Sequence, residues 1–355
     1  MSMSDFSKYK TMELPRTVVV GHGVLQSIPE NCMKLGMPKS ALIIADDVTR
    51  KIAGSDISAL LGDAGYNVES AVIKEADSAT VRKIEKIASE VGPAFLVGVG
   101  GGRPIDVAKC ASFNAGMPFI SVPTAASHDG IVSSKASITV KGVKESLDAQ
   151  SPIAVFADTG IIIKSPFRML AAGCGDIISN KTAVLDWKLA YKMGLDEYSS
   201  YAATLSEITA DMLIENADQI VPDVEESAWQ VIKALVSSGV AMSIAGSSRP
   251  ASGAEHKFSH ALDRIAKKPA LHGEQCGIGA IMMMSLHRGK WKSIRDALKT
   301  IGAPTTAKGA GLSREDVILA LVKAGSIRPE RYTILGNDGL TEEKAEILAE
   351  KTGVV

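Results

Sequence analysis

Residues 95–106 read FLVGVGGGRPID and place a short apolar stretch directly before three consecutive glycines. Phe95–Val99 is predicted to form a buried strand, and Asp106–Phe113 is predicted to form the helix that follows. Glycines lack Cβ atoms, so the main chain can approach a bulky anion, and the N-terminus of a helix offers free N–H groups and a partial positive charge. The turn therefore favours a dinucleotide pyrophosphate over a plain strand-to-helix connection, although its spacing differs from the GxGxxG pattern.

Strands and helices alternate on both sides of this turn. Val81–Val91 carries its apolar residues on one helical face. Lys141-Gly142 lies between the stretches Ser137–Val140 and Val143–Ser146, which predicts a hairpin. Further strands are predicted at Thr17–Gly21, Ala41–Ala45, Asn67–Ile73, Phe119–Val122, Ile153–Phe156 and Ile161–Ile163. This alternation is typical of a parallel sheet covered by helices on both faces.

The second half of the chain has helical spacing nearly throughout. Ser165 is expected to cap a helix and Pro166 to be its first residue. Helices are predicted at Met169–Asp186, Leu205–Ala217, Glu225–Ile244, His256–Ile265, Cys276–Leu286, Trp291–Ile301, Ser313–Val322 and Glu342–Glu350. The predicted fold class is an α/β N-terminal nucleotide-binding domain with a Rossmann-like parallel sheet, residues 1–164, followed by an all-α C-terminal domain, residues 165–355.

The composition excludes several classes of protein. The chain has 355 residues, of which 46% are hydrophobic, and its 39 Lys and Arg residues are balanced by 40 Asp and Glu residues. Nucleic-acid binding needs an excess of basic residues, so we expect no nucleic-acid partner. No apolar stretch approaches about 18 residues, so we expect no membrane insertion. The N-terminal segment carries charges where a secretory signal needs an apolar core, and we expect a cytoplasmic protein. The isolated cysteines, which include Cys174 and Cys276, are expected to be buried as small apolar side chains.

Two further polar turns follow predicted strands. Asp46-Asp47 comes after the strand at Ala41–Ala45, where an acidic residue can bond an adenosine ribose or cap a helix that begins at Val48. The sequence alone leaves both possibilities open. In the stretch that follows Pro123, the hydroxyls of Thr124 and Ser127 are candidates for binding a cofactor, and Asp129 is a candidate for binding a substrate hydroxyl. An ordinary polar loop is the alternative for this stretch.

The helical half contains a possible metal site. Asp176 lies in a strongly apolar helix, where an unpaired carboxylate is costly to bury, so a cationic partner is expected. His256 and His260 are four residues apart and share a helix face, and His272 follows shortly after. Two histidines and one carboxylate form a catalytic metal site with a position left open for substrate. The spacing does not choose between His256 with His260 and His256 with His272 as the ligand pair.

Five segments occur together in an order typical of one known superfamily. They are VGVGGGRPIDVAK, SVPTAASHDGIVSSKASI, FADTGIIIKSPFRMLAAGCGDIISNKTAVLDW, SGAEHKFSHALD and LHGEQCGIGAIMMM, and they span most of residues 95–285. The combination resembles the superfamily of iron-containing alcohol dehydrogenases, glycerol dehydrogenases and dehydroquinate synthases. Within it, the GRPID turn and the Ser-His-Asp-Gly run at 127–130 are most similar to the archaeal-type sn-glycerol-1-phosphate dehydrogenase family.

The resemblance implies a role for each matching residue. Asp176, His256 and His272 match the metal ligands of the family, and zinc is the expected metal. His260 and Asp129 match residues at the substrate, and we assign catalytic roles to both; Asp176 is also expected to contact substrate. The residues that match contacts with NAD(H) or NADP(H) are Gly102, Arg103, Pro104, Ile105, Asp106, Thr124, Ala125, Ala126, Ser127 and Ser133. The motifs do not identify the residues that bind the substrate phosphate.

The implied activity is the reversible NAD(P)H-dependent reduction of dihydroxyacetone phosphate to sn-glycerol 1-phosphate. This product is the glycerophosphate backbone of archaeal-type membrane phospholipids. The implied partner is a small phosphorylated triose or polyol, and the protein is expected to be a homo-oligomer, a dimer or an octamer. The alternatives are a glycerol dehydrogenase, which acts on a polyol without phosphate, a carbocycle-forming lyase of the dehydroquinate synthase type, and a nucleotide-binding protein that is not an enzyme.

Overall fold

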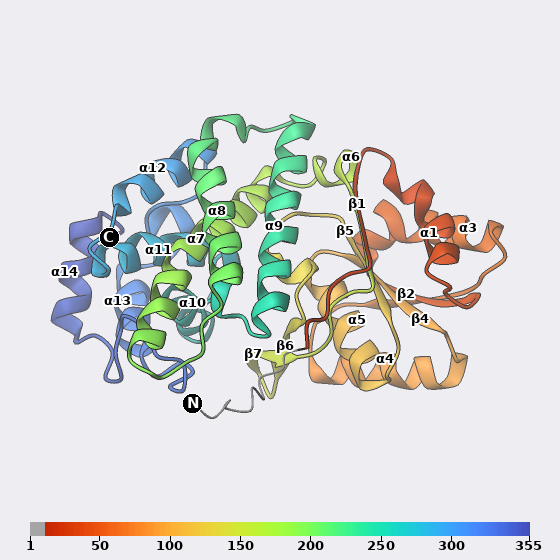
Figure 1. Ribbon diagram of the computed structural model, residues 1–355, viewed down its shortest axis with the longest axis horizontal. Helices are drawn as coiled ribbons and strands as arrows, with labels where there is room; N and C mark the ends of the chain where they lie inside the picture. Colours follow the sequence, from red (N-terminus) through yellow and green to blue (C-terminus); the bar gives the residue numbers. More distant parts are fainter. Residues whose placement is uncertain (1–10) are drawn as a thin grey trace, which may run out of the picture.

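The computed structural model describes residues 11–355, and a six-stranded sheet organises the first half of the chain (Figure 1). All of its strands are parallel, in the spatial order β1-β8-β5-β4-β2-β3. Their bounds are β1 Thr17–Gly21, β2 Ser40–Asp46, β3 Asn67–Ile73, β4 Phe95–Gly100, β5 Phe119–Pro123 and β8 Ala154–Asp158. The parallel sheet predicted from the alternating pattern is confirmed.

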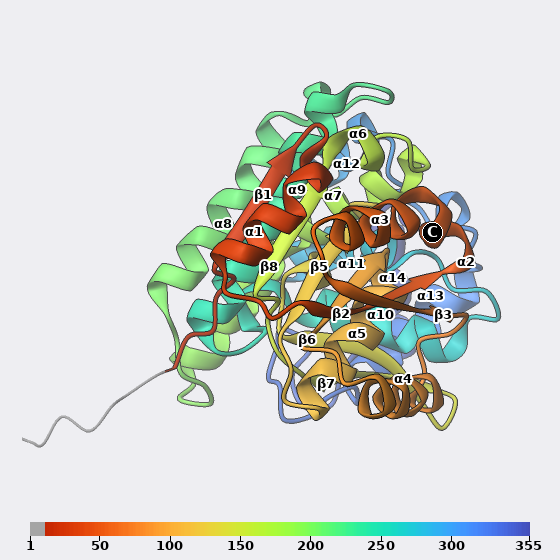
Figure 2. The ribbon, with the colours of Figure 1, turned by 90° about the vertical axis from the view of Figure 1, so that its right-hand side faces the viewer.

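Helices cover both faces of this sheet (Figure 2). Ile43 of β2 packs with α1 and α3, whereas its neighbour Ile44 packs with α4 and α5 on the opposite face. Successive residues of a strand point to opposite faces, so a continuous apolar run such as ALIIA serves two cores. The helices are α1 Ile28–Lys34, α3 Ser55–Asp63, α4 Ser78–Val91 and α5 Gly102–Asn114, with the short segments η1 Val24–Ser27, α2 Asp47–Thr49 and η2 Arg50–Gly54.

The predicted hairpin is confirmed as β6 Lys135–Val140 and β7 Val143–Asp148, an antiparallel pair outside the main sheet. Lys141 and Gly142 both have positive φ, 50° and 81°. Two such residues in a two-residue connection suit the right-handed twist of the flanking strands. The hairpin packs against α5, and the N–H of Ser137 in β6 donates to the carboxylate of Asp106 in α5 over 3.1 Å.

The strand predicted at Ile161–Ile163 is wrong. Residues 159–162 form the short helix α6 Thr159–Ile162 instead. Asp158 is the last residue of β8, and its carboxylate accepts a hydrogen bond from the N–H of Gly160. Asp158 is therefore the N-cap of α6. The run of three isoleucines has the composition of a strand, but this cap starts a helical turn first.

The second half of the chain is helical, as predicted. Its helices are α7 Phe167–Lys192, α8 Ser200–Glu215, α9 Glu225–Ala245, α10 Ala254–Ile265, α11 His272–Leu286, α12 Trp291–Ile301, α13 Arg314–Ala324 and α14 Glu342–Thr352. The start of α7 is one residue later than predicted: Pro166 is the N-cap, and the hydroxyl of Ser165 donates to Ile162 at the end of α6. The division into domains at residues 164 and 165 stays a prediction.

Among the described residues, α9 is the one helix that is long and apolar enough to cross a membrane. Of its most apolar window, 61% is buried inside the protein. Its side chains Val231, Ile232 and Leu235 belong to the core that joins the helical half to one face of the sheet. The hydrophobicity of α9 is therefore used in internal packing.

Glycines allow α7 and α11 to approach very closely. A Cβ atom on Gly175 of α7 would collide with the main chain of Gly273, and a Cβ on Gly273 would collide with the carbonyl of Ala172. A third glycine, Gly173, faces the carbonyl of Ala126 in the loop after β5 in the same way. This crossing brings the middle of α7 next to the start of α11 and to the edge of the sheet.

Candidate active site

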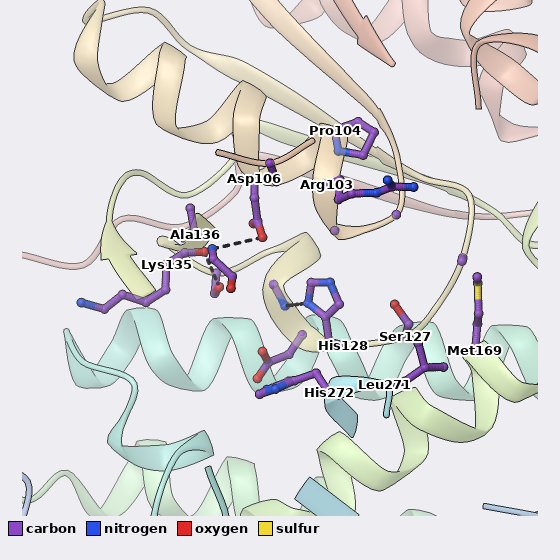
Figure 3. Close-up of a pocket in the computed structure, with 18 of the residues that line it drawn as sticks. Arg103, Pro104, Asp106, Ser127, His128, Lys135, Ala136, Met169, Leu271 and His272 are labelled. Atoms are coloured by element: carbon purple, nitrogen blue, oxygen red, sulfur yellow. Dashed lines mark hydrogen bonds between the residues drawn. The ribbon is translucent and has the colours of Figure 1, made fainter. Parts of the chain in front are cut away.

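A cleft with a volume of about 1110 Å³ lies between the carboxyl edge of the sheet and the helical half. Figure 3 shows Arg103, Pro104 and Asp106 of α5 on one wall, and Leu271 and His272 at the start of α11 on the opposite wall. Ligands of open α/β sheets bind at this edge, at the switch point where the connections from two neighbouring strands run in opposite directions. In this sheet the switch point lies between β2 and β4, because the chain leads from β2 to β3 on one side and from β4 to β5 on the other.

The glycine turn after β4 lies at this switch point. Gly101 is the N-cap of α5 and lines the cleft, and a Cβ on it would meet no atom within 4 Å. A Cβ on Gly102 would instead collide with the imidazole of His128. The two glycines therefore differ: Gly101 leaves space for a ligand at the start of α5, and Gly102 makes room for a protein side chain.

Asp46 caps the helix that begins after it. Its Oδ1 accepts hydrogen bonds from the N–H groups of Val48 and Thr49, at 3.0 and 2.8 Å. Of the two possibilities left open by the sequence, capping is therefore confirmed, and contact with a ribose stays a prediction. Asp46 also lines the cleft, and its Oδ2 lies 3.6 Å from the guanidinium of Arg103.

A buried ion pair ties α5 to the loops beside the cleft. Lys109 is completely buried, with its Nζ 3.4 Å from Oδ1 of Asp106. The same ammonium donates to the carbonyls of Gly130 and Lys135, each over 2.6 Å. Asp106, predicted to contact the cofactor, thus lines the cleft but has both of its carboxylate oxygens bound to protein groups, since Ser137 binds the other one.

Most of the residues predicted to bind the cofactor line the cleft. Ile105 and Ala126 are the exceptions: both are fully buried, in the core that joins α5 to the loop after β5. Those that line the cleft are Gly102, Arg103, Pro104, Asp106, Thr124, Ala125, Ser127 and Ser133. Their roles in binding a cofactor stay predictions.

The three predicted metal ligands meet next to the cleft: His256 and His272 line it, and Asp176 is buried beside them. Oδ1 of Asp176 lies 3.7 Å from Nε2 of His256 and 3.7 Å from Nε2 of His272. The thiol of Cys276 joins them, and the ligand atoms of all four side chains lie within 4.8 Å of one another. The structure thus brings His272, rather than His260, to His256 and Asp176.

Neighbouring groups orient the two histidines. The Nδ1 atom of His256 is 3.0 Å from Oε1 of Glu255, and that of His272 is 3.1 Å from Oγ of Ser259. Glu255 is itself buried and accepts a hydrogen bond from the hydroxyl of Thr182 over 2.7 Å. Holding one ring nitrogen directs the other towards Asp176, which is the usual arrangement around histidine ligands of a metal.

This group fits a divalent metal ion. Oδ1 of Asp176 is buried and has no hydrogen-bond partner among the described residues. Burial, followed by the negative charge of Asp129, raises the pKa of Asp176 to about 7. Burial also lowers the pKa of His272, which favours the neutral ring that a metal needs. A cation at this point would satisfy the orphaned oxygen and relieve the cost of the buried charge. One carboxylate and two imidazoles are a donor set suited to zinc.

The two predicted catalytic residues lie beside the metal-binding group. Asp129 lines the cleft; its N–H donates to Oδ2 of Asp176 over 2.9 Å, and its carboxylate accepts from Ser238 over 2.8 Å. His260 also lines the cleft, with its ring centroid 6.0 Å from that of His272. Nδ1 of His260 is buried without a partner among the described residues, and burial lowers the pKa of His260 to about 3.

Several residues at the site were not predicted from the sequence. Glu255 and Ser259 hold the histidines. Cys276 is buried, as expected, and its thiol is also placed among the possible metal ligands. His128 packs between the glycine turn and its own loop, where its Nδ1 accepts from the N–H of Gly130 over 3.0 Å. The adjacency of Glu255 to His256 is the one sequence signal that points to such a supporting residue.

Relatives of known name cover nearly the whole chain. The chain is 59% identical over 346 residues to the glycerol-1-phosphate dehydrogenase [NAD(P)+] of Methanosarcina acetivorans. This alignment covers 98% of this chain and 97% of the relative. It is 54% identical over 344 residues to the enzyme of the same name from Thermococcus sibiricus, which covers 97% of this chain and 98% of the relative. Residues 19–166 match the family model described as iron-containing alcohol dehydrogenase.

Solved structures share the fold at lower sequence identity. Glycerol dehydrogenase from Schizosaccharomyces pombe superposes with a TM-score of 0.83 at 20% identity, covering 98% of this chain and 91% of that one. Sulfoacetaldehyde reductase from Bifidobacterium kashiwanohense, solved in complex with NAD+, superposes with a TM-score of 0.73 at 18% identity and covers 97% and 98% of the two chains. The predicted fold class and the resemblance carried by the five sequence segments are both confirmed. By its identity to these relatives over almost its entire length, the chain belongs to the glycerol-1-phosphate dehydrogenase [NAD(P)+] family.

Proposed function

We propose that this NAD(P)-dependent oxidoreductase reduces dihydroxyacetone phosphate reversibly to sn-glycerol 1-phosphate, with zinc at Asp176, His256 and His272. The observation that carries the proposal is the position of the orphaned Asp176 oxygen and the two histidine Nε2 atoms next to the cleft into which the glycine turn opens. A bound metal ion and a bound nicotinamide would therefore share one cavity.

Zinc held by these three residues would act as a Lewis acid on the C2 carbonyl oxygen, and NAD(P)H would supply the hydride. The chain provides the setting for this chemistry. Glu255 and Ser259 hold the two imidazoles so that their Nε2 atoms face Asp176. Three protein ligands leave a position for substrate, which is typical of catalytic rather than structural zinc.

Asp129 and His260 act on the substrate in this proposal. Asp129 holds a hydroxyl of the substrate with its carboxylate, while its N–H keeps the loop on Asp176. His260 lies one helical turn, about 6 Å, along α10 from His256. From there its neutral imidazole orients the substrate or relays a proton to the oxygen at C2.

The cofactor lies along the carboxyl edge of the sheet in this proposal. Its pyrophosphate faces the N-terminus of α5 at Gly101 and Gly102, with Thr124, Ser127 and Ser133 at the adjoining loop. Helix N-termini attract such anions through free N–H groups and the helix dipole. Asp46 lies near enough to this end of the cleft to meet the adenosine ribose.

The activity is tested by a kinetic comparison. Purified protein is assayed with dihydroxyacetone phosphate and each nicotinamide, and the configuration of the product is determined with an enzyme specific for one glycerol phosphate enantiomer. Formation of sn-glycerol 1-phosphate is expected. Faster turnover of glycerol than of glycerol 1-phosphate would indicate the glycerol dehydrogenase alternative, and chemistry without net NAD(P)H consumption would indicate the dehydroquinate synthase alternative.

The proposal also covers the use of the product, the location of the enzyme in the cell and its assembly. Its product supplies the glycerophosphate backbone of archaeal-type membrane phospholipids. The enzyme works in the cytoplasm as a homo-oligomer, without insertion into a membrane. Packing of the apolar helix α9 inside the protein supports the last point.

A further inference from the structure

Arg328 is an unpaired cation on the wall of the cleft. It lines the cavity together with His260 and His272 and is half-buried. Within residues 11–355, its guanidinium makes no hydrogen bond and no ion pair within 4.0 Å; the carboxylates that act on it electrostatically are those of Glu330 and Asp148. Burial lowers the pKa of Arg328, the direction expected for a cation that loses water without gaining a close partner. An anionic ligand would compensate this loss.

The backbone at Arg328 is held in an unfavourable conformation. Its φ is 48°, a left-handed value that side chains with a Cβ rarely adopt, and Pro329 follows it. The N–H of Arg331 donates to the carbonyl of Arg328 over 2.9 Å, which closes a tight turn with proline at its second position. Such strain persists where the surroundings enforce it, and it is concentrated at functional positions.

Arg331 anchors this turn to the cleft wall. Its guanidinium donates to the carbonyl of Ser252 over 2.8 Å and to the hydroxyl of Ser248 over 2.9 Å. Both serines line the cleft. Arg331 is therefore engaged in fixing the turn, whereas Arg328 at the other end of the turn faces the cavity.

A second cation reaches the cleft from the hairpin. Lys144 of β7 lines the cavity, and its Nζ lies 3.4 Å from Oδ2 of Asp263 on α10. Along α10, His256 comes first, His260 lies about 6 Å further on, and Asp263 lies about 10 Å from His256. Lys144 thus enters the cleft on the same side of the metal-binding group as His260.

The other cations that line the cleft are either engaged or exposed. Arg103 donates to the carbonyl of Lys74 over 2.9 Å and lies beside Asp46 at the nucleotide end of the cleft. Lys135 pairs with Asp148 on the neighbouring strand. Lys164, which also lines the cavity, is exposed. Among the cleft-lining cations in the described part of the chain, Arg328 therefore combines burial with a free guanidinium.

We infer that Arg328 and Lys144 form the subsite for the phosphate group of the substrate, with Arg328 as the main contact. This inference rests on the proposed function, because it names the residues that would select a phosphorylated triose over an unphosphorylated one. A planar guanidinium can give two parallel hydrogen bonds to phosphate oxygens. The carbonyl end of the substrate then lies at the metal-binding group, with His260 between the two ends.

The test compares two substrates in a charge-removing variant. Arg328→Gln should lower kcat/KM for dihydroxyacetone phosphate about 10- to 100-fold, the range for a lost charged hydrogen bond. It should leave kcat/KM for dihydroxyacetone within about twofold of wild type. Lys144→Gln should give a smaller loss, because Asp263 already shares that charge. Arg328→Lys should recover part of the loss, since the charge remains.

A matched control is available at Arg288. This arginine also has positive φ, 57°, but it is exposed and outside the cleft. Arg288→Gln should change neither substrate's kcat/KM, so it controls for effects of substitution at a left-handed position. Inorganic phosphate provides a direct probe: with NADH as cofactor, it should compete with dihydroxyacetone phosphate in wild type and compete at least about tenfold more weakly in Arg328→Gln.

The outcomes separate this inference from the proposed function. If wild-type protein does not turn over dihydroxyacetone phosphate, the proposed function fails. If wild type is active and Arg328→Gln keeps both its KM and its inhibition by phosphate, the subsite is elsewhere and the inference is overturned. An equal loss with both substrates would also overturn it, because it would reveal a structural role for Arg328.

Discussion

The N–H of Asp129 donates a hydrogen bond to Oδ2 of Asp176 over 2.9 Å. This bond joins the loop after β5, which carries the proposed substrate contacts, to α7, which carries a proposed metal ligand. The carboxylate of Asp129 is bound separately, by the hydroxyl of Ser238 over 2.8 Å. One residue therefore positions the loop through its main chain and keeps its side chain at the cleft.

Because these two functions use different atoms, a side-chain substitution can separate them. Asp129→Asn keeps the N–H and should keep a full equivalent of metal, while kcat/KM falls about 10- to 100-fold through loss of the charged acceptor. Metal analysis beside steady-state kinetics measures both quantities. Ser238→Ala is the control that removes only the hydroxyl, and it should have the smaller effect. Loss of metal in Asp129→Asn would mean that its carboxylate supports the metal site as well.

The histidines of α10 and α11 should differ in what they bind. His272→Ala removes an Nε2 that faces Asp176 and should abolish both bound zinc and activity. His260→Ala should retain zinc and lose turnover, because His260 stands outside the group of four side chains whose ligand atoms converge. Metal content by mass spectrometry, with kcat measured on the same samples, distinguishes the two variants. Zinc loss at His260→Ala would mean that His256 and His260, which share one helix face, are the ligand pair.

Glu255 should act on the metal without touching it. Glu255→Gln weakens the carboxylate that orients His256, and zinc affinity should fall about 10- to 100-fold. Competition with a chelator of known affinity measures this change. Asp158→Asn is a matched control: Asp158 is another buried carboxylate, and its hydrogen bonds go to the N–H groups of Leu25 and Gly160 rather than to α10, so its loss should lower stability and leave zinc affinity unchanged. Equal zinc affinities in wild type and Glu255→Gln would remove Glu255 from the site.

The order of elements in the fold follows from periodicity that is local in the sequence. Strands such as Asn67–Ile73 and helices such as Trp291–Ile301 have the predicted bounds, because apolar spacing and turn residues are visible within ten or so positions. The error at Ile161–Ile163 has a different origin. There, three β-branched residues suggest a strand, but the cap from Asp158 starts a helix, and a single side-chain hydrogen bond outweighs composition.

The site is less predictable, since its parts come from distant segments. Spacing places His256 and His260 on one helix face but contains no information on where the next helix crosses. The crossing depends on Gly175 and Gly273, whose missing side chains let α7 and α11 meet. No sequence pattern identifies Arg328 as a candidate site residue. Its guanidinium without a close partner and its left-handed backbone are visible only in the folded structure.

The last two glycines of the turn after β4 should respond differently to the same substitution. Gly101→Val adds a side chain to open space in the cleft at an ordinary φ of −80°, so the protein should fold normally. If the pyrophosphate lies at this helix N-terminus, the added side chain occupies its place and NADH affinity should fall by at least about tenfold.

Gly102→Val should also weaken NADH binding, but for another reason. Its side chain collides with His128, so His128 or the start of α5 must move, and the midpoint of thermal unfolding should fall as well. Fluorescence titration with NADH and thermal melting of both variants give the comparison, with zinc content as the check on the helical half. The pair His128→Ala with Gly102→Val should restore much of the lost stability, because it removes the colliding ring. If Gly101→Val binds NADH as tightly as wild type, the pyrophosphate does not lie at the start of α5.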